Sequence, residues 1–226
     1  DNSLLSMIDA ADDLELAGAL TRDATVLPAC DVLIDFTSPA GFRQWLSACV
    51  EAKTPFLSGT TGLTDADNAL LDDAAEMIPV LHNTNTSLGV ALLNRLARDA
   101  ARVLGDEFDV EIVEAHHNQK KDAPSGTAST LADAVLDGLG RSRDALQFGR
   151  HGMTPRDAAT VGVHSLRLGD VVGEHTAHFA GQGERIELTH KATSRDTFAR
   201  GALRAARWLA SQPAGRYVID NVLALA

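Results

Sequence analysis

Cysteine, long apolar runs and positive charge are all scarce in this sequence. Its 226 residues include two cysteines, Cys30 and Cys49, which fall beside a predicted strand and on a predicted helix. We therefore expect buried free thiols rather than a disulfide or a metal pair, which fits a reducing cytoplasm. No apolar run approaches the ~18 residues of a membrane span, and the acidic, polar first residues do not resemble a signal peptide.

The charge balance counts against two classes of partner. There are 20 Lys and Arg residues against 31 Asp and Glu residues, so the formal net charge is −11 at pH 7. A chain this acidic is not expected to bind a nucleic-acid backbone or an anionic membrane. Its length and its 45% hydrophobic content suffice for one large core or two modest ones, as in an ordinary soluble globular protein.

Two functional signatures are also missing. A doubly wound nucleotide-binding domain opens on a strand and a glycine-rich turn, but this sequence opens on a predicted helix, with Leu4, Leu5 and Ile8 at helical spacing. The G-x-G patterns at 138–140 and 181–183 lack a third glycine and favour a helix end and a hairpin turn. No H-E-x-x-H motif occurs, which weakens the case for a metal-dependent hydrolase.

Residue types suited to proton transfer and anion binding are most concentrated between Glu114 and Ala128, in the run E-A-H-H-N-Q-K-K-D-A-P-S-G-T-A. Two adjacent histidines can exchange protons near neutral pH, and two lysines add positive charge. Residues 124–127 are typical of a helix start, where unpaired amides and the positive end of the helix dipole bind carboxylate or phosphate. The segment therefore predicts a site that binds an anion and then moves a proton.

The histidines do not form an obvious metal site. Adjacent strand residues point to opposite faces, so His116 and His117 are not expected to bind one metal ion. For His175, His178 and His190 we expect a structural or hydrogen-bonding role. We expect no metal in this protein.

Three charged residues near the dense segment allow other roles. Lys121 is expected to be a solvated charge, and Asp122 to cap or hydrogen-bond the turn before the helix. Arg167 has two interpretations that the sequence favours about equally. It either forms a bidentate pair with a carboxylate or serves as a salt-bridged edge residue.

Strands and helices alternate over the first part of the chain. Strands are predicted at 14–20, 31–36, 55–58, 79–82 and 108–115. Helices are predicted at 42–52, 65–77, 88–104 and 127–139. This alternation predicts a parallel sheet with helices on both faces.

The pattern changes after a turn-rich connector at 148–157. Strands are predicted at 161–168, 171–180 and 185–191, joined by glycine-containing turns, which indicates a separate sheet with hairpin connections. A helix at 195–210 and an apolar tail at 217–225 follow.

The run from Glu114 to Ala128 resembles the signature of the 4-hydroxy-tetrahydrodipicolinate reductase family, the dihydrodipicolinate reductases of lysine biosynthesis. Further blocks keep the family's order across nearly the whole chain: I-D-F-T-S-P at 34–39, G-T-T-G at 59–62, G-D-V-V-G-E-H-T at 169–176 and T-H-K-A at 189–192. The resemblance implies reduction of 4-hydroxy-tetrahydrodipicolinate to tetrahydrodipicolinate by hydride transfer from NADPH or NADH, in the diaminopimelate route to lysine.

The resemblance also implies an architecture. It is an α/β fold with a Rossmann-like doubly wound parallel sheet, whose first strand and glycine turn are missing from this chain, and a second α+β substrate and oligomerisation domain. We expect a nucleotide-binding domain at 1–87, the second domain at 88–194 and returning helices at 195–226. The family has a longer loop and another strand near 22–24, so a gap in the sequence is expected there. The implied assembly is a cytoplasmic homotetramer with a small dicarboxylate as substrate, and we expect closure of the two domains over cofactor and substrate.

Site roles follow from the same resemblance. In the family, the residue matching His116 is the acid/base, and the residue matching Lys120 donates a proton or stabilises charge. Residues matching His117, Gly126 and Thr127 hold substrate carboxylates. Cofactor contacts are expected from Arg22, Gly59, Thr60, Thr61, Asn83, Thr84, Asn85 and Thr86.

The segment Leu20-Thr21-Arg22 is expected to contact the adenosine ribose. A carboxylate at this place favours NADH, whereas an arginine pairs with the added phosphate of NADPH. Family members that accept both cofactors can carry Glu-Arg here, so Thr21 with Arg22 predicts a shift towards NADPH, with NADH still accepted. The alternative is that Arg22 is a flexible surface residue.

Two other functional classes remain open from the residues alone. A metal-dependent hydrolase would use the histidines as ligands, lose activity to a chelator and ignore nicotinamide. A nucleotide-sensing or inactive binding protein would have lost the glycine turn altogether. The sequence upstream of Asp1 would distinguish this second class from a reductase.

Overall fold

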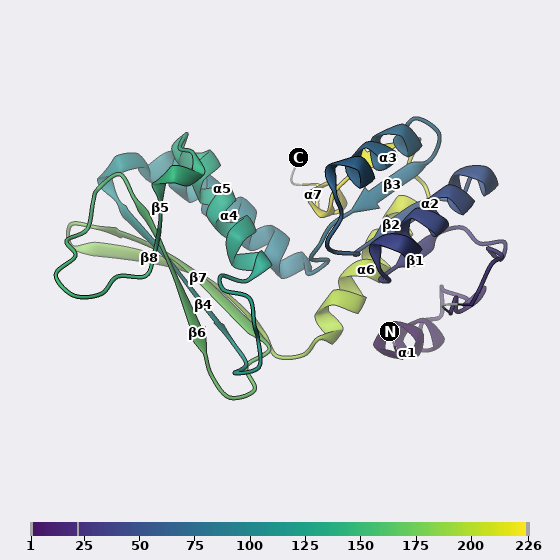
Figure 1. The fold of residues 1–226 in the computed structure, drawn as a ribbon, viewed down its shortest axis with the longest axis horizontal. Helices are drawn as coiled ribbons and strands as arrows, with labels where there is room; N and C mark the ends of the chain where they lie inside the picture. Colours follow the sequence, from purple (N-terminus) through teal and green to yellow (C-terminus); the bar gives the residue numbers. More distant parts are fainter. Residues whose placement is uncertain (1, 22, 225–226) are drawn as a thin grey trace. The chain divides into compact units, whose positions relative to one another are not determined.

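The computed structural model describes residues 2–21 and 23–224, and the chain divides into two compact units (Figure 1). The first unit combines Asp1–Leu88 with Asp196–Ala226, and the second is Gly89–Arg195. Each unit has its own sheet and its own hydrophobic core.

A parallel sheet forms the centre of the first unit. Its described strands lie in the order β1-β2-β3-β9. The strands are β1 (Leu33–Asp35), β2 (Phe56–Ser58), β3 (Pro79–His82) and β9 (Gly215–Tyr217). The helices are α1 (Asn2–Asp9), α2 (Pro39–Ala52), α3 (Asp65–Ala75), α6 (Asp196–Leu209) and α7 (Ile219–Val222). Helices α2 and α3 cover one face, and α6 covers the other with α1 beside it (Figure 1).

The helix starts in this unit follow from local sequence. Ser38 caps α2 by accepting a hydrogen bond from the Gly41 amide, and Pro39 occupies the first turn. Thr64 and Asp67 form a reciprocal capping box at the start of α3. The predicted α/β class, with a parallel sheet between helices, is confirmed.

One predicted strand of the first unit is absent, and one strand was not predicted. Residues 14–20 form no strand; Leu14 packs on the core beside α6 and Leu20 on the core beside α2. The segment therefore passes from one face of the sheet to the other instead of pairing along its edge. Strand β9 was missed, because three residues of mixed character carry no periodicity.

The second unit has a five-stranded mixed sheet in the order β5-β6-β4-β7-β8. Its strands are β4 (Asp109–His116), β5 (Leu146–Phe148), β6 (Val161–Arg167), β7 (Gly173–Gly181) and β8 (Glu184–Ala192). Its helices are α4 (Leu88–Leu104), α5 (Gly126–Leu139) and the short 3-10 turns Gly105–Glu107 and Arg143–Ala145. Apolar side chains of α4 and α5 pack with alternate residues of β4, β6 and β7 to form the core on one face.

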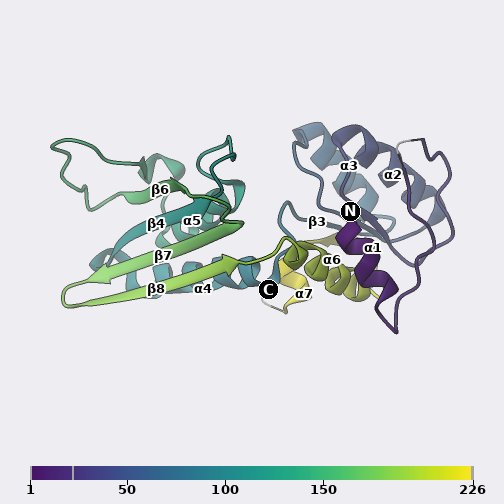
Figure 2. The same cartoon turned by 90° about the horizontal axis from the view of Figure 1, so that it is seen from below.

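The strand pairing corrects a second prediction. Strands β6 and β7 are not a hairpin, because β4 lies between them and pairs with β6 in parallel and with β7 in antiparallel. Only β7 and β8 form the expected hairpin, with Gly183 at a φ of 85° in its turn (Figure 2). A turn signal shows where the chain reverses but not which strand fills the neighbouring position. Strand β5 overlaps the predicted connector.

Both cysteines are free thiols, as predicted, but only Cys49 is buried as expected, and Cys30 is half-buried. Burial raises the pKa of Cys49 to about 12. Among the residues that the structure describes, no helix combines the length and apolar character needed to cross a membrane.

Candidate active site

Strand β4 carries two functional groups on one face. Glu114 and His116 are two residues apart, so their side chains point to the same side of the sheet. Glu114 is fully buried and His116 is nearly so. The His116 Nδ1 atom lies 2.5 Å from Glu114 Oε2, which joins an imidazole to a carboxylate at the end of the strand.

Glu114 receives more than this one hydrogen bond. The Ser125 amide donates to Oε1 over 3.2 Å, and Arg167 Nη1 donates to both carboxylate oxygens over 3.1 and 3.0 Å. Burial raises the pKa of this carboxyl, but hydrogen bonds from Ser165, His116 and Arg167 outweigh it and hold the pKa below its ordinary value. Glu114 is therefore an ionised carboxylate in the interior. Arg167 pairs with it rather than standing free for a substrate, which favours the salt-bridge interpretation.

The N-terminus of α5 has features that suit the binding of an anion. Ser125 is the N-cap, and its hydroxyl accepts a hydrogen bond of 3.0 Å from the Ala128 amide. Gly126 is exposed, with nothing within 4 Å of the position that a Cβ would take, and Thr127 is half-buried. Because the first turn of a helix leaves its N–H groups without intrahelical acceptors, this open end suits a carboxylate.

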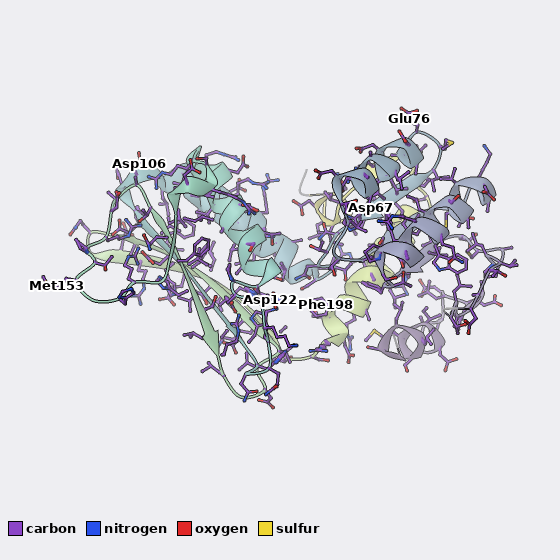
Figure 3. The ribbon with its side chains drawn as sticks, in the orientation of Figure 1. Asp67, Glu76, Asp106, Asp122, Met153 and Phe198 are labelled. Carbon is purple, nitrogen blue, oxygen red and sulfur yellow. The ribbon has the colours of Figure 1, made fainter. Side chains whose placement is uncertain are left out.

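Lys120 lies in the turn between β4 and α5. Its ammonium group donates to both oxygens of Asp122, which is labelled in Figure 3, over 2.8 and 2.9 Å. This hydrogen bonding lowers the pKa of Asp122. Arg167 Nη2 donates to the Asp122 carbonyl over 2.6 Å and so anchors the same turn. The side chain of Asp122 thus pairs with Lys120, while Ser125 caps the helix. Lys121 is exposed, as predicted.

His175 of β7 completes the buried part of the site. It is 3% exposed, its ring centroid lies 5.1 Å from that of His116, and its Nε2 is 3.0 Å from Ser125 Oγ. Burial, together with the electrostatic effect of the neighbouring His116, lowers the pKa of His175 to about 4. His175 is therefore a neutral, hydrogen-bonded residue at neutral pH, as predicted for its role.

Glu114 links the predicted substrate residues, although no role was predicted for it from the sequence. Glu114 contacts His116, the helix cap beside Gly126 and, through Arg167, the turn that holds Lys120. His117 follows directly and is half-buried. The sequence did point to Glu114, because this acidic residue falls on the same face of the strand as the buried apolar residues of β4. A carboxylate at such a position needs partners inside the protein.

A second polar cluster lies in the first unit, where β1, β2 and β3 end at one edge. The Asp35 carboxylate is almost fully buried and accepts four hydrogen bonds. Thr37 donates through its amide and its hydroxyl, over 3.1 and 2.6 Å, and Ser58 and Thr60 donate through their hydroxyls, over 2.7 and 2.8 Å. Asp35 therefore ties together the loops that follow β1 and β2.

Gly59 packs closely against Phe36 at this edge. A Cβ there would overlap the Phe36 ring, and the Gly59 amide donates to the Asp35 carbonyl over 2.8 Å. The Thr60 carbonyl lies 2.9 Å from His82 Nε2 at the end of β3. The loop after β2 is thus held close to both neighbouring strand ends.

The predicted cofactor residues fall into three groups. Thr61 and Thr84 are exposed. Asn83 and Asn85 stabilise their own turn, through Asn83 Nδ2 to the Asn85 carbonyl over 2.6 Å and the Ser87 amide to Asn85 Oδ1 over 2.8 Å. Thr60 and Thr86 are buried with internal partners, the Asp35 carboxylate and the Phe198 carbonyl respectively. Arg22 lies outside the described residues.

Within the described ranges 2–21 and 23–224, no group of three or more His, Cys, Asp or Glu side chains has an arrangement that could hold a metal ion. The histidines of the site instead have hydrogen-bond partners within the protein.

Comparisons with known proteins cover both units. The family described as "Dihydrodipicolinate reductase, N-terminus" matches residues 2–86, and "Dihydrodipicolinate reductase, C-terminus" matches residues 89–223. The 4-hydroxy-tetrahydrodipicolinate reductase of Acinetobacter baumannii is 48% identical over 94% of this chain and 77% of its own length. That of Alkalilimnicola ehrlichii is 50% identical over 95% and 78%.

A solved structure shares the fold. Dipicolinate-bound dihydrodipicolinate reductase from Paenisporosarcina sp. TG-14 superposes with a TM-score of 0.74 and 21% identity, over 96% of this chain and 92% of that one. The arrangement of strands and helices in this protein is thus found in a protein of known structure.

Proposed function

This chain belongs to the dihydrodipicolinate reductase family, and we infer that it reduces 4-hydroxy-tetrahydrodipicolinate to tetrahydrodipicolinate with NADH or NADPH, in the diaminopimelate route to lysine. The observation that carries this function is the match of both units to one reductase family, with relatives at 48% and 50% identity. The hydrolase and binding-protein alternatives have no comparable support.

The net reaction replaces a hydroxyl group by hydrogen. One hydride and one proton enter, and the hydroxyl leaves as water, so atoms and charge balance only if the site supplies a proton. When bound, the nicotinamide supplies the hydride. The protein's own residues must deliver the proton and stabilise the negative charge that hydride addition places on the substrate.

We propose that His116 donates the proton and that Lys120 stabilises the negative charge that develops on the substrate. His116 is buried against Glu114 at the end of β4, and positioned proton transfer contributes roughly 100- to 10,000-fold in enzymes. Lys120 is paired with the exposed carboxylate of Asp122, so a substrate anion can take the place of that carboxylate without uncovering a buried charge. The pair keeps Lys120 oriented until substrate arrives.

We propose that the substrate carboxylates bind at the open end of α5. Gly126 and Thr127 present the first-turn amides, and His117 follows His116 on the other side of the turn. The second unit is then the substrate-binding unit.

The strand ends of the first unit fit a nicotinamide cofactor. They lie at the carboxyl ends of parallel strands, where exposed Thr61 and Thr84 with the Asn83–Asn85 turn supply polar groups. We propose that buried Thr60 and Thr86 shape this edge from within. A preference for NADPH through Arg22 stays a prediction, and we assign no resident metal.

We further propose a cytoplasmic homotetramer assembled through the sheet of the second unit. Helices α4 and α5 pack on one face of that sheet, while β8 is largely exposed and Leu166, Leu168 and Ile186 stand out to solvent. Light scattering of the full-length protein at micromolar concentration is expected to report four copies. A monomer would contradict the proposal.

The assignment is tested by mixing full-length protein, NADPH and freshly generated 4-hydroxy-tetrahydrodipicolinate and following the loss of reduced-nicotinamide absorbance. Pyridine-2,6-dicarboxylate is expected to inhibit competitively against this substrate. It should bind roughly 10- to 100-fold more tightly than pyridine-2-carboxylate, because a second charged hydrogen-bonding contact is formed. Added salt should weaken the inhibition. Equal binding of the diacid and the monoacid would rule out a site for two carboxylates.

A further inference from the structure

We propose that Glu114 is a positioning residue, which holds His116 by its Nδ1–H so that the proton passed to the substrate leaves from Nε2. This inference rests on the proposed role of His116 as proton donor. It adds a residue, a tautomer and a direction of proton transfer to that role.

The hydrogen-bond chemistry of Glu114 sets the tautomer. An ionised carboxylate only accepts hydrogen bonds, so the imidazole nitrogen 2.5 Å from Glu114 Oε2 must carry a hydrogen. In neutral His116 that leaves Nε2 as the atom with a free lone pair. Protonated His116 then carries its transferable proton on Nε2.

The carboxylate cannot turn away from His116. Oε1 accepts from the Ser125 amide and Arg167, and Oε2 accepts from His116 and Arg167. The side chain is fully buried, so no solvent replaces a lost partner. Since every neighbour is a donor, a group that only accepts is required at this position.

The opposite edge of the imidazole is kept clear. A Cβ on Gly173 would lie 3.1 Å from His116 Nε2, so glycine leaves that nitrogen approachable where another residue would crowd it. The His175 ring packs across the imidazole at an interplanar angle of 73°. The ring is thus held at Nδ1 and along its side, with Nε2 as the end that remains for chemistry.

The charged and titratable neighbours of His116 come from several elements. Glu114 lies on β4, Arg167 at the end of β6 and His175 on β7, and the charge of Lys120, in the turn after β4, acts on His175. Glu114 is the one carboxylate among these groups. Its removal should therefore disfavour protonated His116.

The first test is Glu114→Gln in the full-length enzyme. An amide offers one donor side, which must face either His116 or the Ser125 amide, so it cannot reproduce the carboxylate. We expect kcat to fall roughly 10- to 100-fold with little change in KM or in NADPH affinity. The alkaline fall of kcat/KM should move to lower pH by about one unit. Glu114→Asp, which keeps the charge, should retain the wild-type pH limb while recovering part of kcat.

The matched control is Glu111→Gln. Glu111 lies on the same strand and accepts hydrogen bonds from Arg150, Arg156 and His164, but it does not contact His116. This variant should keep the wild-type pH profile. A lower kcat in Glu114→Gln with an unshifted profile would mean that Glu114 is merely structural and would overturn the proposal.

A second measurement needs no variant. In wild-type protein labelled with 15N-histidine, the ring-nitrogen chemical shifts of neutral His116 should show a protonated Nδ1 and an unprotonated Nε2. The reverse pattern would overturn the inference even if Glu114→Gln does not fold. If His116→Ala instead retains full turnover, the proposed catalytic role fails, and that outcome is distinct from a wrong tautomer.

Discussion

Replacing Lys120 with alanine is expected to lower kcat by about 100- to 1,000-fold while leaving the affinity for NADPH nearly unchanged. The lysine lies in the second unit, paired with Asp122, whereas the strand ends proposed to bind the cofactor belong to the first unit. Its loss removes charge stabilisation needed while hydride adds to the substrate. His116→Ala should have an effect of similar size, because it removes the proton donor.

Lys121→Ala is the matched control, since it removes the same charge from an exposed neighbouring residue. It should leave kcat within about twofold of wild type, as expected for a surface substitution. Steady-state kinetics and NADPH titration separate the two effects. A parallel loss of NADPH binding in Lys120→Ala, or an equal kcat loss in Lys121→Ala, would refute the assignment.

The second unit is expected to lose stability as the pH falls from about 6.5 towards 4, because His175 is buried in its neutral form. Its pKa is about 4 in the folded protein against an ordinary value of 6.5. Between these values the unfolded chain binds a proton that the folded chain does not, so lowering the pH favours unfolding. The difference amounts to about 2 kcal/mol at pH 5 and about 3 kcal/mol near pH 4.

His175→Gln should remove this part of the pH dependence, while His178→Gln, a half-exposed site on the same strand, should keep it. Both tryptophans, Trp45 and Trp208, belong to the first unit, so their fluorescence would report the wrong half of the molecule. Hydrogen exchange of β7 amides between pH 7 and pH 5 is the suitable measurement, after correction for the intrinsic exchange rate. Identical pH slopes in wild type and His175→Gln would contradict the prediction.

Much of the fold was predictable because local signals were strong. The helices at α2, α3, α4 and α5 combine apolar periodicity with caps such as Ser38 and Thr64, and these were located to within a few residues. The error in the second unit came from strand pairing, which is a nonlocal property. The placement of β4 between β6 and β7 depends on contacts between residues far apart in sequence, and no turn residue encodes it.

In the candidate active site, too, the features encoded locally were predicted and those that depend on distant residues were not. The run from Glu114 to Ala128 identified the region, since His116, Lys120 and the helix start are close in sequence. The role of Glu114 was not predicted, because it depends on Arg167 approaching from β6. The contact of His175 with Ser125 likewise joins β7 to the start of α5.

The division of the chain also sets an order for folding during synthesis. Residues 89–195 form one continuous stretch, and it is inserted between the two segments of the first unit. A ribosome therefore finishes every strand of the second unit before it adds α6, which packs with Leu4, and β9, which pairs with β3. Domains commonly fold as units while the chain emerges, usually with the N-terminal one first. Here we expect the N-terminal segment to complete its packing last, because the residues that α6 and β9 contact stay uncovered until the end of synthesis.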